Sequence, residues 1–352
     1  MGKAAGSISS MAARRSSGLN ADCGGDPLRS GSPFLRRFAL GVTIAAWLAA
    51  GAFAAEQPWE IPAWLKSHVG DGAGQIAPVV LQRARALYLR KVAAGVVKNR
   101  CYFAMDATRP SDGGLGKRFY EICEADRSFR AMSAGHGSGR NIKGAVNFAN
   151  GKECAKNFGN ALDSNLTTGG AYVTAETKTS FKGYFRSAAK QEAILMRSFV
   201  QFDGEGETAN ARERAIGGHP AVLLKAIHYR SMARSPYANV NGCVPVGTVV
   251  DYASGRSNGC TSWSRSDAER IITKLEKPTT VYIYPESQDI KAVAQAVPAH
   301  RSLSSSSPYW NAFCLRQIGA PKFWSNEALG PILARYRRTS EPAANPVPTC
   351  KP

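Results

Sequence analysis

Gly255-Arg-Ser-Asn-Gly-Cys260 is the stretch on which the interpretation of this chain depends. It follows a strand-like run, Thr248–Tyr252, and precedes a segment whose apolar residues recur at helical spacing. Its glycines let the backbone turn tightly. Because a cysteine just before a helix feels the positive end of the helix dipole, and because Arg256 is close in sequence, we expect Cys260 to have a lowered pKa and a reactive thiolate.

The same turn predicts an oxyanion site. Backbone N–H groups at Gly259 and Cys260 are expected to lack partners there, and such donors stabilise the tetrahedral intermediate of acyl transfer. The competing interpretation is that Cys260 is one half of a disulfide.

The cysteine count bears on that choice. Cys23 lies before a predicted signal segment, and seven cysteines follow it: Cys101, Cys123, Cys154, Cys243, Cys260, Cys314 and Cys350. No two of the seven have the spacing of metal ligands, so we predict no metal site. In an oxidising compartment, seven cysteines give up to three disulfides and one free thiol. The loop context favours Cys260 as that thiol, whereas Cys243 is interpreted as a disulfide partner and Cys350 is expected to pair with Cys314.

The N-terminal region has the pattern of a secretory signal. Arg36-Arg37 precede an apolar run, Phe38 to Ala55, which ends in the small-x-small pattern Ala52-Phe-Ala54. The run is short for a membrane span, which needs about 20 residues, although an uncleaved anchor is the alternative. We therefore predict a signal peptide and n-region at residues 1–55, and export to the periplasm or cell envelope without a transmembrane anchor after cleavage.

The composition is that of a folded, strongly basic protein. The 352 residues include 45 Lys and Arg against 26 Asp and Glu; beyond residue 55, 39 basic and 24 acidic residues leave a net charge of +15. A basic surface attracts polyanions, but the basic residues are scattered and no nucleic-acid-binding motif is found. We expect anionic envelope polymers and the carboxylates of wall peptides as partners, and neither nucleic acid nor a cofactor.

Periodicity predicts a mainly β domain with one helix before it. After a leading segment, residues 76–98 form an amphipathic helix within a region spanning residues 56–99. Core packing is favoured over a membrane surface for its stripe of Val80, Leu81, Ala84, Leu87 and Tyr88. Residues 100–287 form the β domain, and residues 288–352 are expected to be a linker and an irregular C-terminal extension. The predicted strands are Cys101–Asp106, Arg118–Cys123, Phe129–Ala134, Ala171–Thr174, Phe199–Phe202, Thr248–Tyr252 and Thr280–Tyr284. Within the domain, Ser266 and Glu269 have capping-box spacing and predict a helix whose buried stripe is Ala268, Ile271, Ile272 and Leu275.

A thiol nucleophile needs a base, and three of the five histidines are candidates for a place in the site. His136 follows a predicted strand, His219 ends Arg214-Ala-Ile-Gly-Gly-His219, and His228 ends Val222-Leu-Leu-Lys-Ala-Ile-His228. Spacing alone does not place any of them beside Cys260.

A series of segments, taken in order, resembles the murein L,D-transpeptidase catalytic-domain family, which is related to the YkuD-type transpeptidases. The similar segments are Phe103–Ser111, Ala134–Asn141, Asn147–Asn150, Gly169–Thr174, Ala211–Ala221, Gly255–Cys260 and Val281–Pro285. The resemblance covers about residues 100–287 and implies a β-sandwich or barrel with a helix after the nucleophile loop.

The resemblance also implies a mechanism and a set of site residues. Cys260 attacks the carbonyl of an L-to-D peptide bond in a peptidoglycan stem peptide, and a thioester forms. An amine or water then takes the acyl group. His219 is the expected base, with His228 as the alternative, while Ser257 and Gly259 shape the loop. Arg256, Asn258 and His136 are expected to contact the substrate.

Several departures from the family pattern bear on these roles. Gly217-Gly218 stand where the family has branched residues, and Pro220 stands where it has glycine, which weakens the strand before His219. Residues 235–247 look like an insertion, and residues 220–234 fit a helix as well as a strand. The functions left open are a cross-linking transpeptidase, an L,D-carboxypeptidase-type hydrolase, and a catalytically inactive wall-binding module.

Overall fold

The computed structural model describes residues 60–111, 117–186, 192–251, 256–301, 303 and 308–339. All of these belong to one unit, Ala55–Pro352. The predicted signal segment, Gly255, Cys23 and Cys350 lie outside the described residues. Within the described part, no helix combines the length and the apolar character that a membrane crossing needs.

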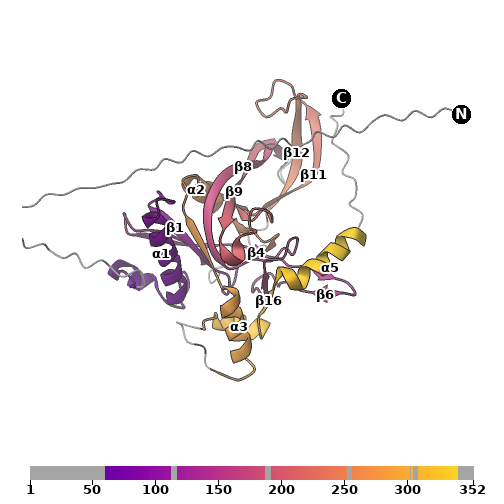
Figure 1. Ribbon diagram of the computed structural model, residues 1–352. Helices are drawn as coiled ribbons and strands as arrows, with labels where there is room; N and C mark the ends of the chain where they lie inside the picture. The colour runs from indigo at the N-terminus through magenta and orange to yellow at the C-terminus, as the bar shows by residue number, and fades with distance from the viewer. Residues whose placement is uncertain are drawn as a thin grey trace, which may run out of the picture. The chain divides into compact units, whose positions relative to one another are not determined.

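Ten of the described strands form one mixed sheet (Figure 1). In sheet order, eight of them are β14 (Thr261–Trp263), β10 (Gly217–Pro220), β9 (Glu192–Gly204), β8 (Gly170–Arg186), β15 (Thr280–Tyr284), β1 (Cys101–Asp106), β2 (Lys117–Cys123) and β3 (Ser128–Ser133). The other two are β11 (Val222–Ser231) and β12 (Cys243–Asp251), a hairpin whose β12 pairs with the end of β8. Three short pairs complete the strands: β4 (His136–Gly137) with β13 (Arg256–Ser257), β5 (Asn141–Ile142) with β6 (Val146–Asn147), and β7 (Asn157–Gly159) with β16 (Lys322–Trp324).

Side chains of the central strands point alternately to the two faces of the sheet, so the buried apolar residues form one cluster on each face. In β1, Tyr102 and Ala104 belong to the cluster under α1 (Pro78–Ala93). Phe103 and Met105 belong to the opposite cluster, which includes the buried stripe of α2 (Arg265–Leu275). The predicted stripes of both helices are therefore confirmed, and α1 packs on the sheet.

The start of α2 differs from the prediction. The N-cap is Ser264, whose hydroxyl accepts a hydrogen bond from the backbone N–H of Asp267 at 3.1 Å, so the predicted capping box at Ser266 is wrong. β14 separates Cys260 from this helix. The helix dipole acts only near the first turn, so it does not activate Cys260 as expected.

The C-terminal part is not irregular where it is described. α3 (Ser287–Ala296) follows β15, and α4 (Ala312–Ile318), β16 and α5 (Asn326–Thr339) come after it. β16 pairs with β7, and Cys314 of α4 forms a disulfide with Cys154. The prediction of an irregular extension is wrong for these residues, because strand pairing and a cross-link join them to the β domain. Short 3-10 helices also occur at η1 (Ala63–His68) and η2 (Gly206–Thr208).

The mainly β character is confirmed, and the mixed sheet is consistent with a sandwich. Each predicted strand is present, but β8 and β9 are much longer than the apolar runs that predicted them. In β8, residues 176–180 are exposed and largely polar, so this part of the strand lacks the apolar signal of a buried strand. In β9, Ile194 and Met196 are apolar but about half exposed, at 51% and 54%. The stretch at 220–234 that also fitted a helix is β10 continuing into β11.

Candidate active site

The parallel pairing of β10 with β14 brings His219 close to Cys260, the residue directly before β14. In the register of β10 and β14, His219 lies opposite Ser262 and Gly218 lies opposite Thr261. Cys260 precedes Ser262 by two residues. The structure thus places the predicted nucleophile diagonally across from the predicted base. Both are nearly enclosed, with 8% of Cys260 and 7% of His219 exposed.

The glycine pair before His219 makes this approach possible. A Cβ on Gly218 would lie 2.0 Å from the ring of Trp263, and one on Gly217 would lie 2.0 Å from the carbonyl oxygen of Val200. Residues larger than glycine would therefore clash at positions 217 and 218, where the family pattern has branched residues. The clashes would be with β9 at position 217 and with the Trp263 ring at position 218.

Ser257 and Gly259 shape the loop that ends in Cys260. The hydroxyl of Ser257 accepts a hydrogen bond from the Gly259 N–H at 3.1 Å and donates to the carbonyl of Cys260. Gly259 has φ of +108°, and a Cβ there would lie 2.9 Å from Leu166 O. Because its N–H is already bonded, Gly259 does not offer the free oxyanion donor that we expected.

The His136 segment supports this loop from behind. β4 pairs with β13, and Ser138 N donates to Ser257 O at 2.8 Å. Asn150 donates to Gly137 O at 2.8 Å. His136 itself is fully buried, with Nδ1 2.7 Å from Arg118 Nη2 and Nε2 3.2 Å from Gly151 O. A buried ring with both nitrogens engaged holds the loop in place, so the expected contact of His136 with substrate is not supported.

Cys260 carries the free thiol among the described cysteines. Its sulfur lies 3.4 Å from Ala215 O, to which the thiol donates a hydrogen bond. Burial raises the pKa of Cys260, against the smaller lowering effects of a hydrogen bond from Gly217 and the charges of Arg197 and Arg214. The expected lowering of this pKa is therefore wrong, because removal from water disfavours the thiolate more than the nearby cations favour it.

His219 is also held neutral. Burial lowers its pKa to about 4, and the charge of Arg197 acts in the same direction. Its Nδ1 lies 2.9 Å from Arg197 Nη2 and 2.9 Å from Pro220 O, and its ring faces Phe199 with 6.5 Å between centroids. Near neutral pH, Cys260 is therefore an uncharged thiol and His219 an uncharged imidazole. A neutral imidazole is the form of histidine that can accept a proton as a general base.

Arg214 is a second cation beside the thiol. It donates to Leu166 O at 2.6 Å and to Thr168, and Nη2 lies 3.5 Å from the position of a Cβ on Gly259. Burial lowers its pKa, and no ion pair of Arg214 is seen among the described residues. A buried guanidinium without a carboxylate partner, beside the loop of Cys260, can form charge-assisted hydrogen bonds with an anionic ligand.

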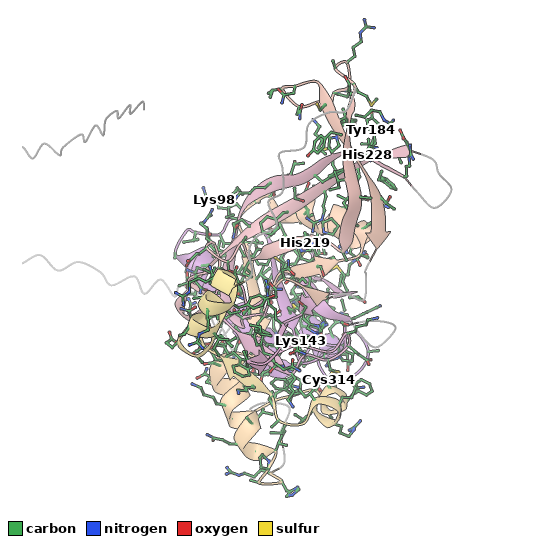
Figure 2. All side chains as sticks on the ribbon, turned by 90° about the vertical axis from the view of Figure 1, so that its right-hand side faces the viewer. Lys98, Lys143, Tyr184, His219, His228 and Cys314 are labelled. Atoms are coloured by element: carbon green, nitrogen blue, oxygen red, sulfur yellow. A yellow bond between two sulfur atoms is a disulfide. The ribbon has the colours of Figure 1, made fainter. Side chains whose placement is uncertain are left out.

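His228, the alternative base, is in another part of the molecule. It is exposed on β11, opposite Val246, which pairs with Tyr184 of β8. β10 pairs with β9 at Val200, which in turn lies opposite Thr177 of β8. Thr177 precedes Tyr184 by seven residues, so the two positions are roughly 20 Å apart along β8. Figure 2 shows His228 beside Tyr184 and apart from His219. His228 is therefore wrong as the alternative base.

Of the other predicted contacts, Asn258 is exposed on the loop, where a ligand can reach it. The backbone of Arg256 lies in β13, opposite His136.

The remaining described cysteines are oxidised. Cys101 pairs with Cys123, Cys154 pairs with Cys314, and Cys243 is also disulfide-bonded. The interpretation of Cys243 as a disulfide partner is confirmed, whereas the expected pairing of Cys314 with Cys350 is wrong. Disulfides of this number are compatible with an oxidising compartment.

Comparison with known proteins gives one weak likeness. No protein-family model matches the chain, and no curated protein matches it either. The chain is similar to a solved structure described as L,D-transpeptidase (Yku) from Stackebrandtia nassauensis, with 13% identity over 63% of this chain and 88% of that chain, and a TM-score of 0.24. A likeness this low assigns neither a fold family nor an activity.

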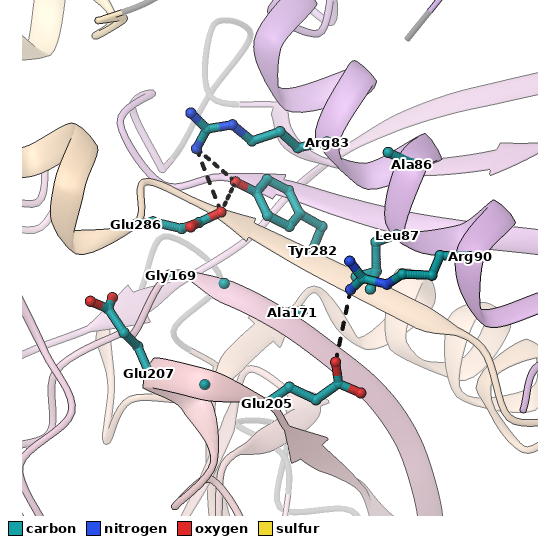
Figure 3. A pocket seen from close by; sticks show the side chains of 12 residues that line it. Arg83, Ala86, Leu87, Arg90, Gly169, Ala171, Glu205, Glu207, Tyr282 and Glu286 are labelled. Carbon is teal, nitrogen blue, oxygen red and sulfur yellow. Dashed lines mark hydrogen bonds and ion pairs between the residues drawn. The ribbon is translucent and has the colours of Figure 1, made fainter. Parts of the chain in front are cut away.

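A pocket of about 420 Å³ is lined by residues of α1, β8, β15 and η2 (Figure 3). It opens between α1, β15 and η2, and neither Cys260 nor His219 lines it. Its charges are largely paired, with Arg83 3.5 Å from Glu286 and Arg90 3.8 Å from Glu205. Paired charges of this kind are typical of a solvated surface hollow, so we do not place the chemistry there.

Sequence reasoning missed Arg197 and gave no role to Arg214. Arg214 lies inside the segment that resembles the family, five residues before His219, so that segment could have drawn attention to it. Arg197 is on a different strand, 22 residues before His219, and its contact with the imidazole depends on the pairing of β9 with β10.

Proposed function

We propose that the chain is an exported cysteine acyltransferase of the L,D-transpeptidase kind that acts on peptidoglycan stem peptides. The observation that carries this proposal is the position of Cys260, whose thiol is free, directly before β14, the strand that pairs with β10 at His219. The ordered sequence resemblance over residues 100–287 supports the choice of substrate. No cofactor takes part in the chemistry proposed.

The proposed reaction proceeds through a thioester. His219 takes the thiol proton as the Cys260 sulfur attacks the stem-peptide carbonyl, and the imidazolium then protonates the leaving amine. The thioester is attacked by an amine of a neighbouring stem, which gives a cross-link, or by water, which gives a trimmed stem. Ser257 fixes the loop that presents the sulfur, and exposed Asn258 contacts the substrate.

The charge distribution supports an anionic partner. The net charge of +19 and the two arginines beside the site, Arg197 and Arg214, fit carboxylate-bearing stem peptides and, over the whole surface, anionic envelope polymers.

The test is incubation of the purified protein with tetrapeptide-bearing muropeptides, followed by mass spectrometry of the products. Wild type is expected to release the terminal D-residue, and Cys260→Ala is expected to release none. New dimers identify a transpeptidase, and shortened monomers without dimers identify a hydrolase. Substrate left unchanged by a folded wild-type protein contradicts the proposal.

One observation favours the inactive wall-binding alternative. The resting thiol has a raised pKa and the imidazole a lowered one, so neither is preformed as an ion pair. Sedimentation with purified sacculi distinguishes an enzyme from a binding module. A binding module is expected to pellet with sacculi to the same extent in wild type and in Cys260→Ala, and to yield no product in either form.

A further inference from the structure

Two groups compete for one atom of His219. Nδ1 lies 2.9 Å from Arg197 Nη2, which only donates, and 2.9 Å from Pro220 O, which only accepts. A ring nitrogen is either a donor or an acceptor, so the two hydrogen bonds exclude each other. His136 shows the contrast, because Arg118 meets its Nδ1 while a different nitrogen, Nε2, faces the Gly151 carbonyl.

The choice at Nδ1 decides whether the ring can act as a base. When Arg197 donates to Nδ1, the ring proton is on Nε2, and no lone pair remains for the thiol proton. When Nδ1–H donates to Pro220 O, Nε2 carries the lone pair. Only this second tautomer can accept the thiol proton at Nε2.

Hydrogen bonds to uncharged acceptors hold the Arg197 guanidinium in this position, and a carboxylate ligand can replace them. Nη1 donates to the Ser180 hydroxyl at 2.8 Å, and Nε donates to Val222 O at 3.1 Å. The β8–β9 register shifts between Thr179 and Phe181, where Phe181 pairs with Arg197, and bulges of this kind re-aim side chains. Among the described residues, no carboxylate forms an ion pair with Arg197, so its charge is not neutralised.

We propose that Arg197 is a positioning residue that holds His219 in the tautomer unable to accept the thiol proton, until a carboxylate-bearing ligand draws the guanidinium away. This proposal rests on His219 being the base of the proposed function. On release, the ring proton moves from Nε2 to Nδ1 through water, Nδ1–H bonds to Pro220 O, and Nε2 receives the Cys260 proton. No net proton is gained or lost before the thiol reacts.

The charged and titratable groups around the pair are few. Arg197 reaches it from β9, Arg214 lies beside the loop of Cys260, and β14 contributes the neutral Ser262 opposite His219. The buried phenol of Tyr172, on β8, also interacts electrostatically with Cys260 and Arg214, and burial raises its pKa. Arg197 acts in opposite directions on the two partners, since its charge favours the thiolate and disfavours the imidazolium. Its direct contact is with the imidazole, so we expect the effect on His219 to dominate.

The experiment measures thiol reactivity and needs no peptidoglycan substrate. Cys260 is alkylated with iodoacetamide from pH 5 to pH 9 in wild type, Arg197→Met, Arg197→Lys and the control Arg230→Met. The side chain of Arg230 is 38% exposed and pairs with Glu192. We expect Arg197→Met to react at least about tenfold faster at pH 7, the equivalent of one pKa unit, and to show a new inflection from the imidazole. Arg230→Met should match wild type, and Arg197→Lys should restore the slow reaction.

Histidine-selective ¹⁵N NMR reports the tautomer directly. We expect the Nε2–H form of His219 in wild type and the Nδ1–H form in Arg197→Met. In wild type, D-alanine should accelerate alkylation and D-alaninamide, which lacks the carboxylate, should not. An Nδ1–H tautomer in wild type, an unchanged pH profile in folded Arg197→Met, or equal effects of the two small molecules would overturn the inference. Because no step uses muropeptides, a failed transpeptidase assay leaves this result standing.

Discussion

The ring of Trp263 occupies the space beside Gly218, where an added Cβ would stand 2.0 Å from the ring. Trp263 is fully buried, and its strand, β14, is the one that begins just after Cys260. The missing side chain at Gly218 therefore lets β10 lie against β14 and brings His219 next to the thiol.

Gly218→Ala should destabilise the protein and disturb the site together. The new methyl group must displace a buried indole, and overpacking of this kind costs about 1–3 kcal/mol. Urea unfolding measures the loss. Gly330→Ala is the matched control, because its Cβ meets nothing closer than 3.6 Å and it lies in α5, where alanine should be neutral or stabilising. Equal stability of the two variants would contradict the steric account.

His219→Gln should abolish the muropeptide reaction while the fold remains. Removing a general base costs roughly a hundredfold or more in rate. His228→Gln removes a histidine that is exposed on β11 and should retain full activity. Turnover of a tetrapeptide muropeptide by both variants gives the comparison, and a similar loss in His228→Gln would reverse the assignment of the base.

The burial of neutral His219 makes the protein less stable in mild acid. Its pKa is about 4 in the folded protein and 6.5 as the ordinary value, so below pH 6.5 the unfolded chain binds the proton first. Stability from this group is complete above pH 6.5, declines as the pH falls, and is fully lost near pH 4, a change of up to about 3 kcal/mol. Denaturant unfolding of wild type and His219→Gln from pH 7 to pH 4 isolates the effect. Parallel curves for the two proteins would show that His219 does not contribute.

The Cys154–Cys314 disulfide should contribute substantially to stability because it closes a loop of 160 residues. Replacing both cysteines with alanine avoids a stray thiol and should lower the unfolding free energy by about 2–5 kcal/mol. The expected loss is greatest for α4 and β16, which hydrogen exchange of the Phe323 and Trp324 amides can report. Unchanged exchange there would mean that the pairing of β16 with β7 holds this region by itself.

The sequence by itself determined the elements with a strong local signal. The stripe of α1, the stripe of α2 and the short apolar strands β1, β2 and β15 follow from periodicity, because burial on one face selects apolar residues at a fixed spacing. The loop ending in Cys260 could also be recognised, since its glycines and Ser257 serve local turn geometry.

Only the tertiary structure decided which groups surround that loop. The sign of the Cys260 pKa shift depends on burial, which local sequence does not show. The choice between His219 and His228 depends on which strand lies beside β14, and the contact of Arg197 with His219 depends on the pairing of β9 with β10. These are relations between residues distant in sequence, fixed by strand pairing and by the fit of Trp263 against Gly218, so no local pattern carries them.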